Sequence, residues 1–142
     1  MNAKEYLSQA LRIDQRINSK LEQVASLREL AVKASSTLSD TPRRASPDIQ
    51  PMETIIAKIL DLEAEINGDI DKLVDLKKEI TDVIKSVSNP EYQTILEKRY
   101  LCFLSWEQIA VDMNYSIQYT FRMHDRALAE VAASLKVESK VD

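Results

Sequence analysis

Glycine and proline are scarce in this 142-residue sequence, which has one Gly and four Pro. Both residues interrupt helices, and helix-favouring Ala, Leu, Glu and Lys are abundant, so the composition predicts an all-α protein. No segment approaches the run of about 18 apolar residues that a membrane-spanning helix needs. The first residues also lack the apolar segment of a signal peptide. We therefore expect a cytoplasmic protein with no membrane contact.

Residues that bind metals or act as nucleophiles are equally rare, because the sequence has one Cys and one His. Neither a disulfide nor a Cys/His metal site can be built from them. Cys102 lies among aromatic and aliphatic residues, which predicts a buried thiol acting as a small hydrophobic group. His124 has no partner at a catalytic spacing, and we predict that it lies at the edge of a helix. The sequence thus predicts no enzyme, cofactor or metal.

Residues 1–88 contain two long segments with helical periodicity. From 3 to 38, apolar residues recur every three or four positions. From 52 to 87 they repeat every seven, with a second series three residues further on, as in a coiled coil. Three of the four prolines fall between the two segments, at about 39–51, where no helix can continue. An antiparallel coiled-coil hairpin is therefore predicted, with Asp69 as a polar interruption of its seam.

The apolar face of the second long helix is wider than a single partner helix can cover. Beside the seam lie Ile56, Ile70, Val74 and Ile84. A second subunit is the economical way to cover such a face, so we expect a homo-oligomer, in the simplest case a dimer. The seam residues assigned to oligomerisation are Ile59, Ile66, Leu73 and Ile80.

The stretch 105–128 has the pattern of two short helices joined by a turn. Ser105 and Ser116 occupy N-cap positions, and Gln108 completes a capping box with Ser105. An earlier helix begins at Pro90, where proline suits the first helical position. We predict a helix-turn-helix domain over 89–136.

A polar segment at 137–142 follows this predicted domain. Terminal segments of this kind tend to fray. We therefore predict a flexible tail.

The second helix of this motif has an inward and an outward face. Its inward positions are Thr120, Met123, Ala127 and Leu128. Gln can pair with adenine and Arg with guanine in a major groove, so the outward face predicts binding of double-stranded DNA. The predicted DNA-binding residues are Ser116, Gln118, Tyr119, Arg122 and Arg126, with Lys98 and Arg99 as possible backbone contacts. The alternative is a simple helical hairpin with no bound nucleic acid.

A net charge of −4 is unfavourable for contacts with phosphate. The second long segment, 52–88, holds nine acidic and five basic residues, and the part from 89 onward holds eight and six. Few cations therefore lie near the motif. We expect weak DNA binding by one copy, strengthened by dimerisation or by a partner already on the DNA.

The run LEKRYLCFLSWEQIAVDMNYSIQYTFRMHDRAL, residues 96–128, resembles the fourth conserved region of sigma-70-type factors. The matching positions are Arg99-Tyr100, Ser105, Gln108-Ile109-Ala110 and Arg126-Ala127-Leu128, with Gln108 in place of the usual Glu. With its long helical first half, the chain also resembles phage and prophage transcriptional regulators of the ArpU and RinA type. This resemblance implies a regulator in a bacterial host cell that activates late genes by binding promoters and recruiting RNA polymerase.

Two alternatives stay open. A small terminase-like DNA-packaging subunit also combines a helix-turn-helix with a coiled coil, and a closed ring of eight or more subunits would distinguish it. The other alternative is a protein-interaction module that never binds DNA, which the modest basic charge leaves open.

Overall fold

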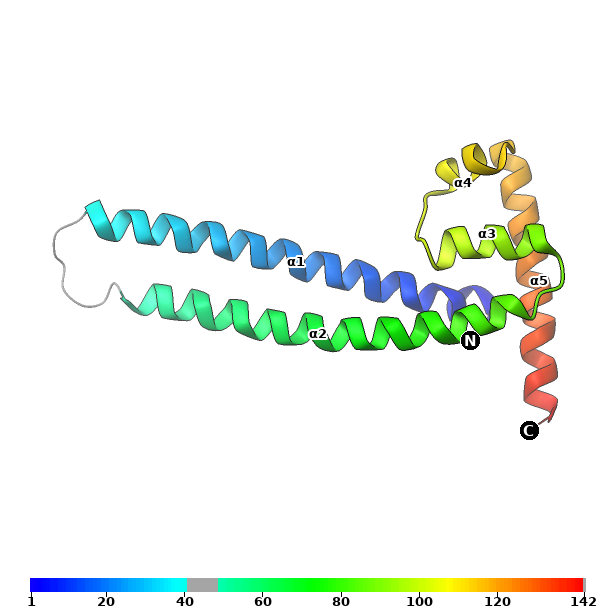
Figure 1. Cartoon of the computed structure of the whole chain (residues 1–142), viewed down its shortest axis with the longest axis horizontal. Helices are drawn as coiled ribbons and strands as arrows, with labels where there is room; N and C mark the ends of the chain where they lie inside the picture. The colour runs from blue at the N-terminus through cyan, green and yellow to red at the C-terminus, as the bar shows by residue number, and fades with distance from the viewer. Residues whose placement is uncertain (41–48, 142) are drawn as a thin grey trace. The chain divides into compact units, whose positions relative to one another are not determined.

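The computed structural model describes the backbone of residues 1–40 and 49–141 and the side chains of residues 1–36 and 51–136. The described backbone contains helices and no strand, which confirms the all-α class (Figure 1). No helix within it is long and apolar enough to cross a membrane. The helices are α1 (Ala3–Asp40), α2 (Ile49–Lys85), α3 (Pro90–Tyr100), α4 (Trp106–Met113) and α5 (Ile117–Val141).

The helix ends differ slightly from those predicted. α1 continues to Asp40 and α2 begins at Ile49, so the predicted loop at 39–51 is shortened at both ends, and residues 41–48 lie outside the described part. Pro51 falls in the first turn of α2, where a missing backbone N–H leaves no helical hydrogen bond unmade. In the predicted flexible tail, 137–142, the backbone is helical through Val141 and the side chains lie outside the described residues.

The chain forms two compact units. The hairpin unit is Asp14–Lys72, and the core unit combines Met1–Ile13 with Leu73–Asp142. The predicted boundary near residue 88 differs from this division. The reason is that the N-terminal end of α1 and the C-terminal end of α2 contribute to the same hydrophobic core as α3, α4 and α5.

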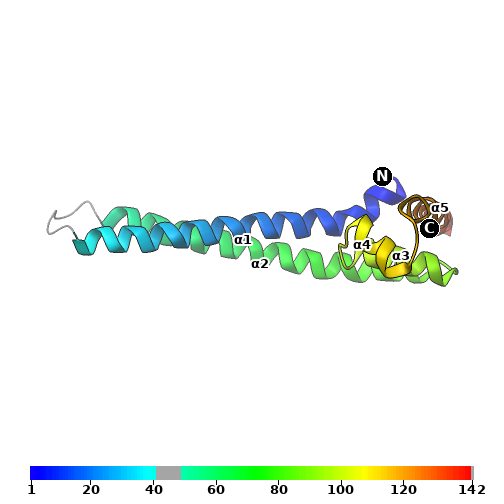
Figure 2. The same ribbon diagram turned by 90° about the horizontal axis from the view of Figure 1, so that it is seen from above.

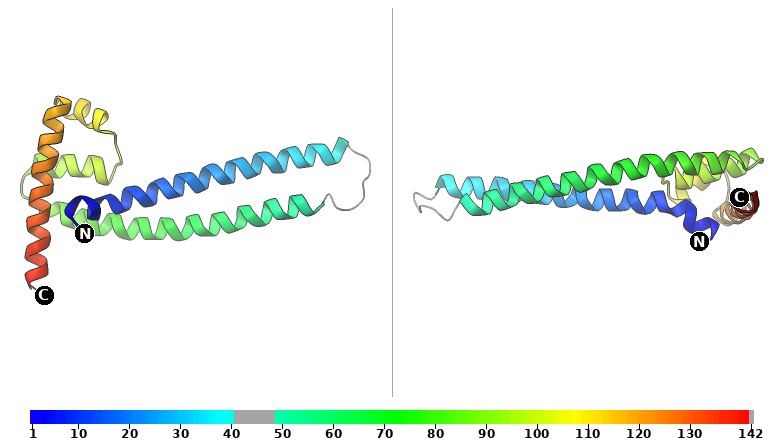
Figure 3. Two further views of the ribbon diagram at one scale, coloured as in Figure 1. Left: turned by 180° about the vertical axis from the view of Figure 1, so that it is seen from behind. Right: turned by 90° about the horizontal axis from the view of Figure 1, so that it is seen from below.

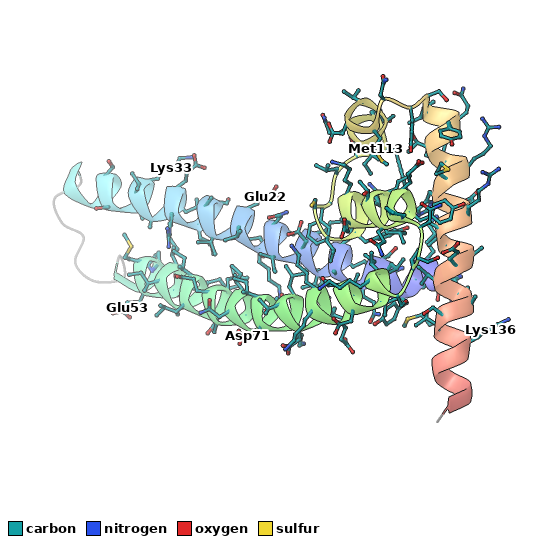
Figure 4. The ribbon with its side chains drawn as sticks, turned by 45° about the vertical axis from the view of Figure 1, so that its right-hand side comes forward. Glu22, Lys33, Glu53, Asp71, Met113 and Lys136 are labelled. Carbon is teal, nitrogen blue, oxygen red and sulfur yellow. The ribbon has the colours of Figure 1, made fainter. Side chains whose placement is uncertain are left out.

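In the hairpin unit, α1 and α2 run antiparallel (Figure 2). Lys20 pairs with Asp69 at 2.6 Å and Glu65 at 3.4 Å, whereas Arg28, further along α1, pairs with Glu63, earlier on α2. The seam between them buries Ile17, Val24, Leu62 and Ile66. On their outer sides, Glu22 and Lys33 project from α1 away from α2, and Glu53 and Asp71 project from α2 away from α1 (Figure 4).

Asp69, the predicted interruption of the seam, is matched by a cation on the other helix. Its carboxylate accepts a hydrogen bond from Lys20 Nζ at 2.6 Å. This bond lowers the pKa of Asp69 and raises that of Lys20, so both groups stay charged. A partly buried polar pair of this kind favours one register of the two helices, because a shifted register would leave each group facing apolar side chains.

The core unit is built around a single hydrophobic cluster. α5 crosses α3 and packs against both α3 and α4 (Figure 3). The N-terminal end of α1 and the C-terminal end of α2 complete the cluster. Its largest fully buried apolar side chains are Leu7, Ile80, Ile84, Val87, Ile95, Leu96, Tyr100, Ile109 and Val131.

The assignment of the heptad seam to oligomerisation stays a prediction, and the burial of its residues within one chain bears on it. Ile66 and Ile80 are buried within the single chain, and Ile59 and Leu73 are half-buried. Periodicity along one helix cannot show which partner covers its face, and here the hairpin's own helices use the seam. Of the residues predicted to widen the face, Ile84 is also buried in the core, while Ile56, Ile70 and Val74 remain exposed.

Replacing Ile80 with Ala tests the core unit. Ile80 is fully buried, so Ile80→Ala should lower the free energy of unfolding by about 2 to 5 kcal/mol through lost burial and the cavity left behind. Val111→Ala, on the exposed surface of α4, should change it by less than about 0.5 kcal/mol. Urea unfolding followed by circular dichroism measures both, and equal losses would contradict the described core.

Candidate nucleic-acid interface

The connection from α3 to α4 is held by Arg99. Its guanidinium donates to the Leu104 carbonyl at 2.9 Å and stacks on the Trp106 ring, 4.6 Å from the centroid. The Ser105 hydroxyl then accepts from the backbone N–H of Gln108 at 3.2 Å and begins α4, as predicted for an N-cap. The predicted use of Arg99 for phosphate contacts therefore competes with a structural role.

The turn between α4 and α5 caps the C-terminal end of α4. Asn114 adopts the left-handed conformation, with φ 59° and ψ 43°, a region that Asn tolerates better than most residues. Its N–H donates to Val111, and the N–H of Tyr115 donates to Ala110 at 2.9 Å, which is the Schellman pattern. These bonds fix the direction in which α5 leaves the turn.

Tyr115 also ties this turn to the start of α3. Its hydroxyl donates to Glu91 Oε2 at 2.6 Å, and this bond raises the pKa of Tyr115 to about 12. The Tyr115 ring meets the Tyr119 ring edge to face, with centroids 4.7 Å apart. The first turn of α5 is therefore supported by two aromatic residues.

Ser116 begins α5, as the sequence predicted. Its hydroxyl accepts from the N–H of Tyr119 at 3.1 Å, and its carbonyl accepts from the Thr120 hydroxyl at 2.9 Å. The hydroxyl of Ser116 is thus engaged in capping. A contact from Ser116 to DNA stays a prediction.

The inward face of α5 agrees with the sequence at Thr120, Met123 and Ala127, which are buried, while Leu128 packs partly buried against the core. His124 differs, because it is buried and does not lie at an edge. The Tyr100 hydroxyl forms a 2.6 Å hydrogen bond with His124 Nε2, which no helical periodicity within α5 could reveal.

Both groups of this buried pair are neutral at pH 7. Burial lowers the pKa of His124 to about 4 and raises that of Tyr100 to about 12. The Trp106 ring packs edge-on against the imidazole, with centroids 4.5 Å apart. One residue from each of α3, α4 and α5 therefore meets at this point.

The outward face of α5 carries the predicted DNA-binding side chains. Gln118, Arg122 and Arg126 are exposed and lie four residues apart, so they follow one another along the same side of the helix. Arg122 lies over the half-buried Tyr119 ring, 5.7 Å from its centroid. Asp125, also exposed, is the acidic neighbour of this series.

Lys98, the other predicted backbone contact, is partly neutralised. Its ammonium lies 3.5 Å from Asp112, whose carboxylate also accepts from Gln108 Nε2 at 2.7 Å. Lys98 therefore links α3 to α4. The exposed cations of the motif are then Arg122 and Arg126, fewer than the sequence suggested.

Three surface features of the motif were not predicted. Cys102, expected to be buried, is exposed because it lies in the turn after α3, where helical spacing no longer indicates burial. Val111 on α4 is 74% exposed, and Phe121 on α5 is also exposed, with its ring edge-on to Trp106. From hydrophobicity alone, all three residues would be predicted to be buried.

Comparison with known proteins gives one family. The family described as "Protein of unknown function (DUF1492)" matches residues 47–132, more than half of the chain, and the chain belongs to this family. No curated protein matches the chain, and no solved structure does. The matched region runs from the start of α2 into α5, so it joins one long helix of the hairpin to the helix-turn-helix.

The buried His124 makes stability depend on pH. In the unfolded chain its imidazole takes up a proton near pH 6.5, whereas the folded protein resists protonation until about pH 4. Stability should therefore be complete above pH 6.5 and fall as the pH drops towards 4, with a loss of about 2 kcal/mol between pH 7 and pH 5.

Urea titrations at several pH values measure this loss. His124 is the sole histidine in the chain, so His124→Gln removes the imidazole contribution altogether. That variant should be less stable at pH 7 but should lose little more between pH 7 and pH 5. The same slope in both proteins would show that another group is responsible.

Proposed function

We propose that this protein is a double-stranded-DNA-binding transcriptional regulator of the phage type. The observation that carries the proposal is the outward face of α5, where Gln118, Arg122 and Arg126 are exposed in successive turns. The same helix is anchored by Thr120, Met123 and Ala127 on its other side. A helix that is fixed on one side and rich in hydrogen-bond donors on the other suits the major groove.

The dimensions of this face support the proposal. Residues 118 to 126 extend about 12 Å along the helix axis at about 1.5 Å per residue. A major groove is about 12 Å wide. Gln118 lies in the first turn, the part of a recognition helix that usually meets base edges, and Arg126 lies two turns further on. We therefore assign base reading to Gln118 and Arg122, and phosphate contact to Arg126.

The regulatory role rests on the likeness of residues 96–128 to the fourth region of sigma-70-type factors. We propose that the protein binds a promoter and recruits RNA polymerase, thereby activating late genes. The two exposed arginines on the outward face of α5 give few phosphate contacts, so we propose a homodimer that brings two such helices to the DNA.

A protein-interaction module is the alternative that one observation favours. Val111 exposes an apolar side chain on α4, in a chain whose net charge is −4. An apolar contact that needs no cations suits a protein partner better than phosphate. In this alternative the motif binds another protein and never DNA.

A random-sequence duplex library tests DNA binding and identifies the operator in the same experiment. Rounds of selection from the library should enrich a defined site, and the labelled selected duplex then measures affinity. Arg122→Ala should cost about 1 to 3 kcal/mol of binding to the selected duplex if Arg122 reads a base. Arg126→Ala should weaken binding to all duplexes and reduce the salt slope by about one.

Arg12→Ala is the matched control, because Arg12 is an exposed arginine on α1 outside the motif. It should leave affinity and salt dependence unchanged. If no site is enriched, or if the Arg122/Arg126 double variant binds as tightly as the wild type, the protein-interaction alternative is preferred. A mass in solution of eight or more chains would instead favour the terminase-like alternative.

A further inference from the structure

One side of the hairpin unit exposes apolar side chains that the fold leaves uncovered. Each of these residues directly follows a seam position, and in an antiparallel helix pair such positions lie on the same side of both helices. We call this surface the hairpin face. It consists of Leu21, Ala25, Arg28 and Val32 on α1 and Ile56, Leu60, Glu63, Asn67 and Ile70 on α2.

Contacts between the two helices confirm that these positions share a side. Arg28 reaches Glu63 across the pair at 3.7 Å. A hollow of about 300 Å³ opens between the helices and is lined by Leu21 and Ala25 from one and by Asn67 from the other. The hairpin face is therefore one continuous surface with a shallow centre.

The opposite side of the hairpin unit is different in character. Its positions directly precede the seam, and half of them are charged, with Ser, Thr, Gln and Gly among the others. They include Arg16, Lys33, Lys58, Asp61, Glu65 and Lys72. Leu30 is the large apolar residue among them, and its exposure of 48% equals that of Leu21 on the hairpin face.

We propose that the hairpin face binds the hairpin face of a second copy of this chain. Of its nine residues two are charged, and these two, Arg28 and Glu63, already pair with each other. The surface thus offers no excess charge to attract DNA or a strongly charged protein. A neutral apolar surface is complementary to itself, as a two-fold interface requires. Asn67 can form a hydrogen bond with a polar group of the partner and so favour one register.

The size of the hairpin face fits a small dimer interface. Residues 56–70 extend about 20 Å along α2, and two adjacent helices are about 20 Å wide, which gives about 400 Å² in projection. Protruding side chains raise the accessible area above that value. Specific interfaces at the small end bury about 600 Å² per partner. We therefore infer a dimer that forms and dissociates with concentration.

The test uses the full chain and a matched pair of substitutions. Leu21→Glu places a charge on the hairpin face, whereas Leu30→Glu places the same charge on the other side of the same helix at equal exposure. Sedimentation velocity over a range of protein concentrations should show the wild type passing from one to two times 16.2 kDa. Leu21→Glu should raise the dissociation constant at least about tenfold, and Leu30→Glu should leave it unchanged.

Leu60→Glu, on α2, is a second variant of the hairpin face. It should act as Leu21→Glu does, and it keeps the test decisive if circular dichroism shows that one variant has lost helicity. A wild type that stays monomeric, or a dimer weakened equally by Leu30→Glu, would overturn the inference. It rests on the proposed homodimer, but its test contains no DNA, so failure here leaves the selection of a DNA site unaffected.

Discussion

The hydrogen bond between Tyr100 and His124 is the interaction on which the helix-turn-helix depends. It joins α3 to α5 inside the core, and Trp106 of α4 packs against the imidazole. Residues two positions away on a helix point about 200° away, so a His124 held inward forces Arg122 and Arg126 outward. A single buried, neutral pair thus sets the rotation of the helix that carries the proposed DNA contacts.

The turn before α5 sets the direction of the helix axis, whereas the buried pair sets the rotation about it. Asn114 takes the left-handed conformation that glycine usually supplies, in a chain whose sole glycine is Gly68. The two backbone bonds of the Schellman pattern close α4, and the Ser116 hydroxyl begins α5 one residue after Tyr115. With rotation and direction both fixed, the backbone of α5 loses little further freedom when the helix contacts a ligand.

Periodicity and capping residues were sufficient to predict the two long helices, both N-caps of the motif and the inward positions Thr120, Met123 and Ala127. They failed where burial depends on a distant residue. His124 is buried because Tyr100, 24 positions earlier, supplies its partner. The exposure of Cys102 was not predicted because this residue lies in a turn, where no repeating spacing indicates burial. The heptad series correctly located a seam, but the spacing within one helix does not identify the partner helix.

The charge distribution links the two surfaces that the fold leaves open. With two exposed arginines on α5 and a net charge of −4, one chain has little general attraction for DNA, so non-specific binding should be weak. Joining two chains through a neutral surface adds no charge to either, yet it makes the second DNA contact intramolecular and raises its effective concentration. In the proposed dimer, affinity would then depend on a site that both helices can occupy, and discrimination would come from that requirement more than from electrostatic attraction.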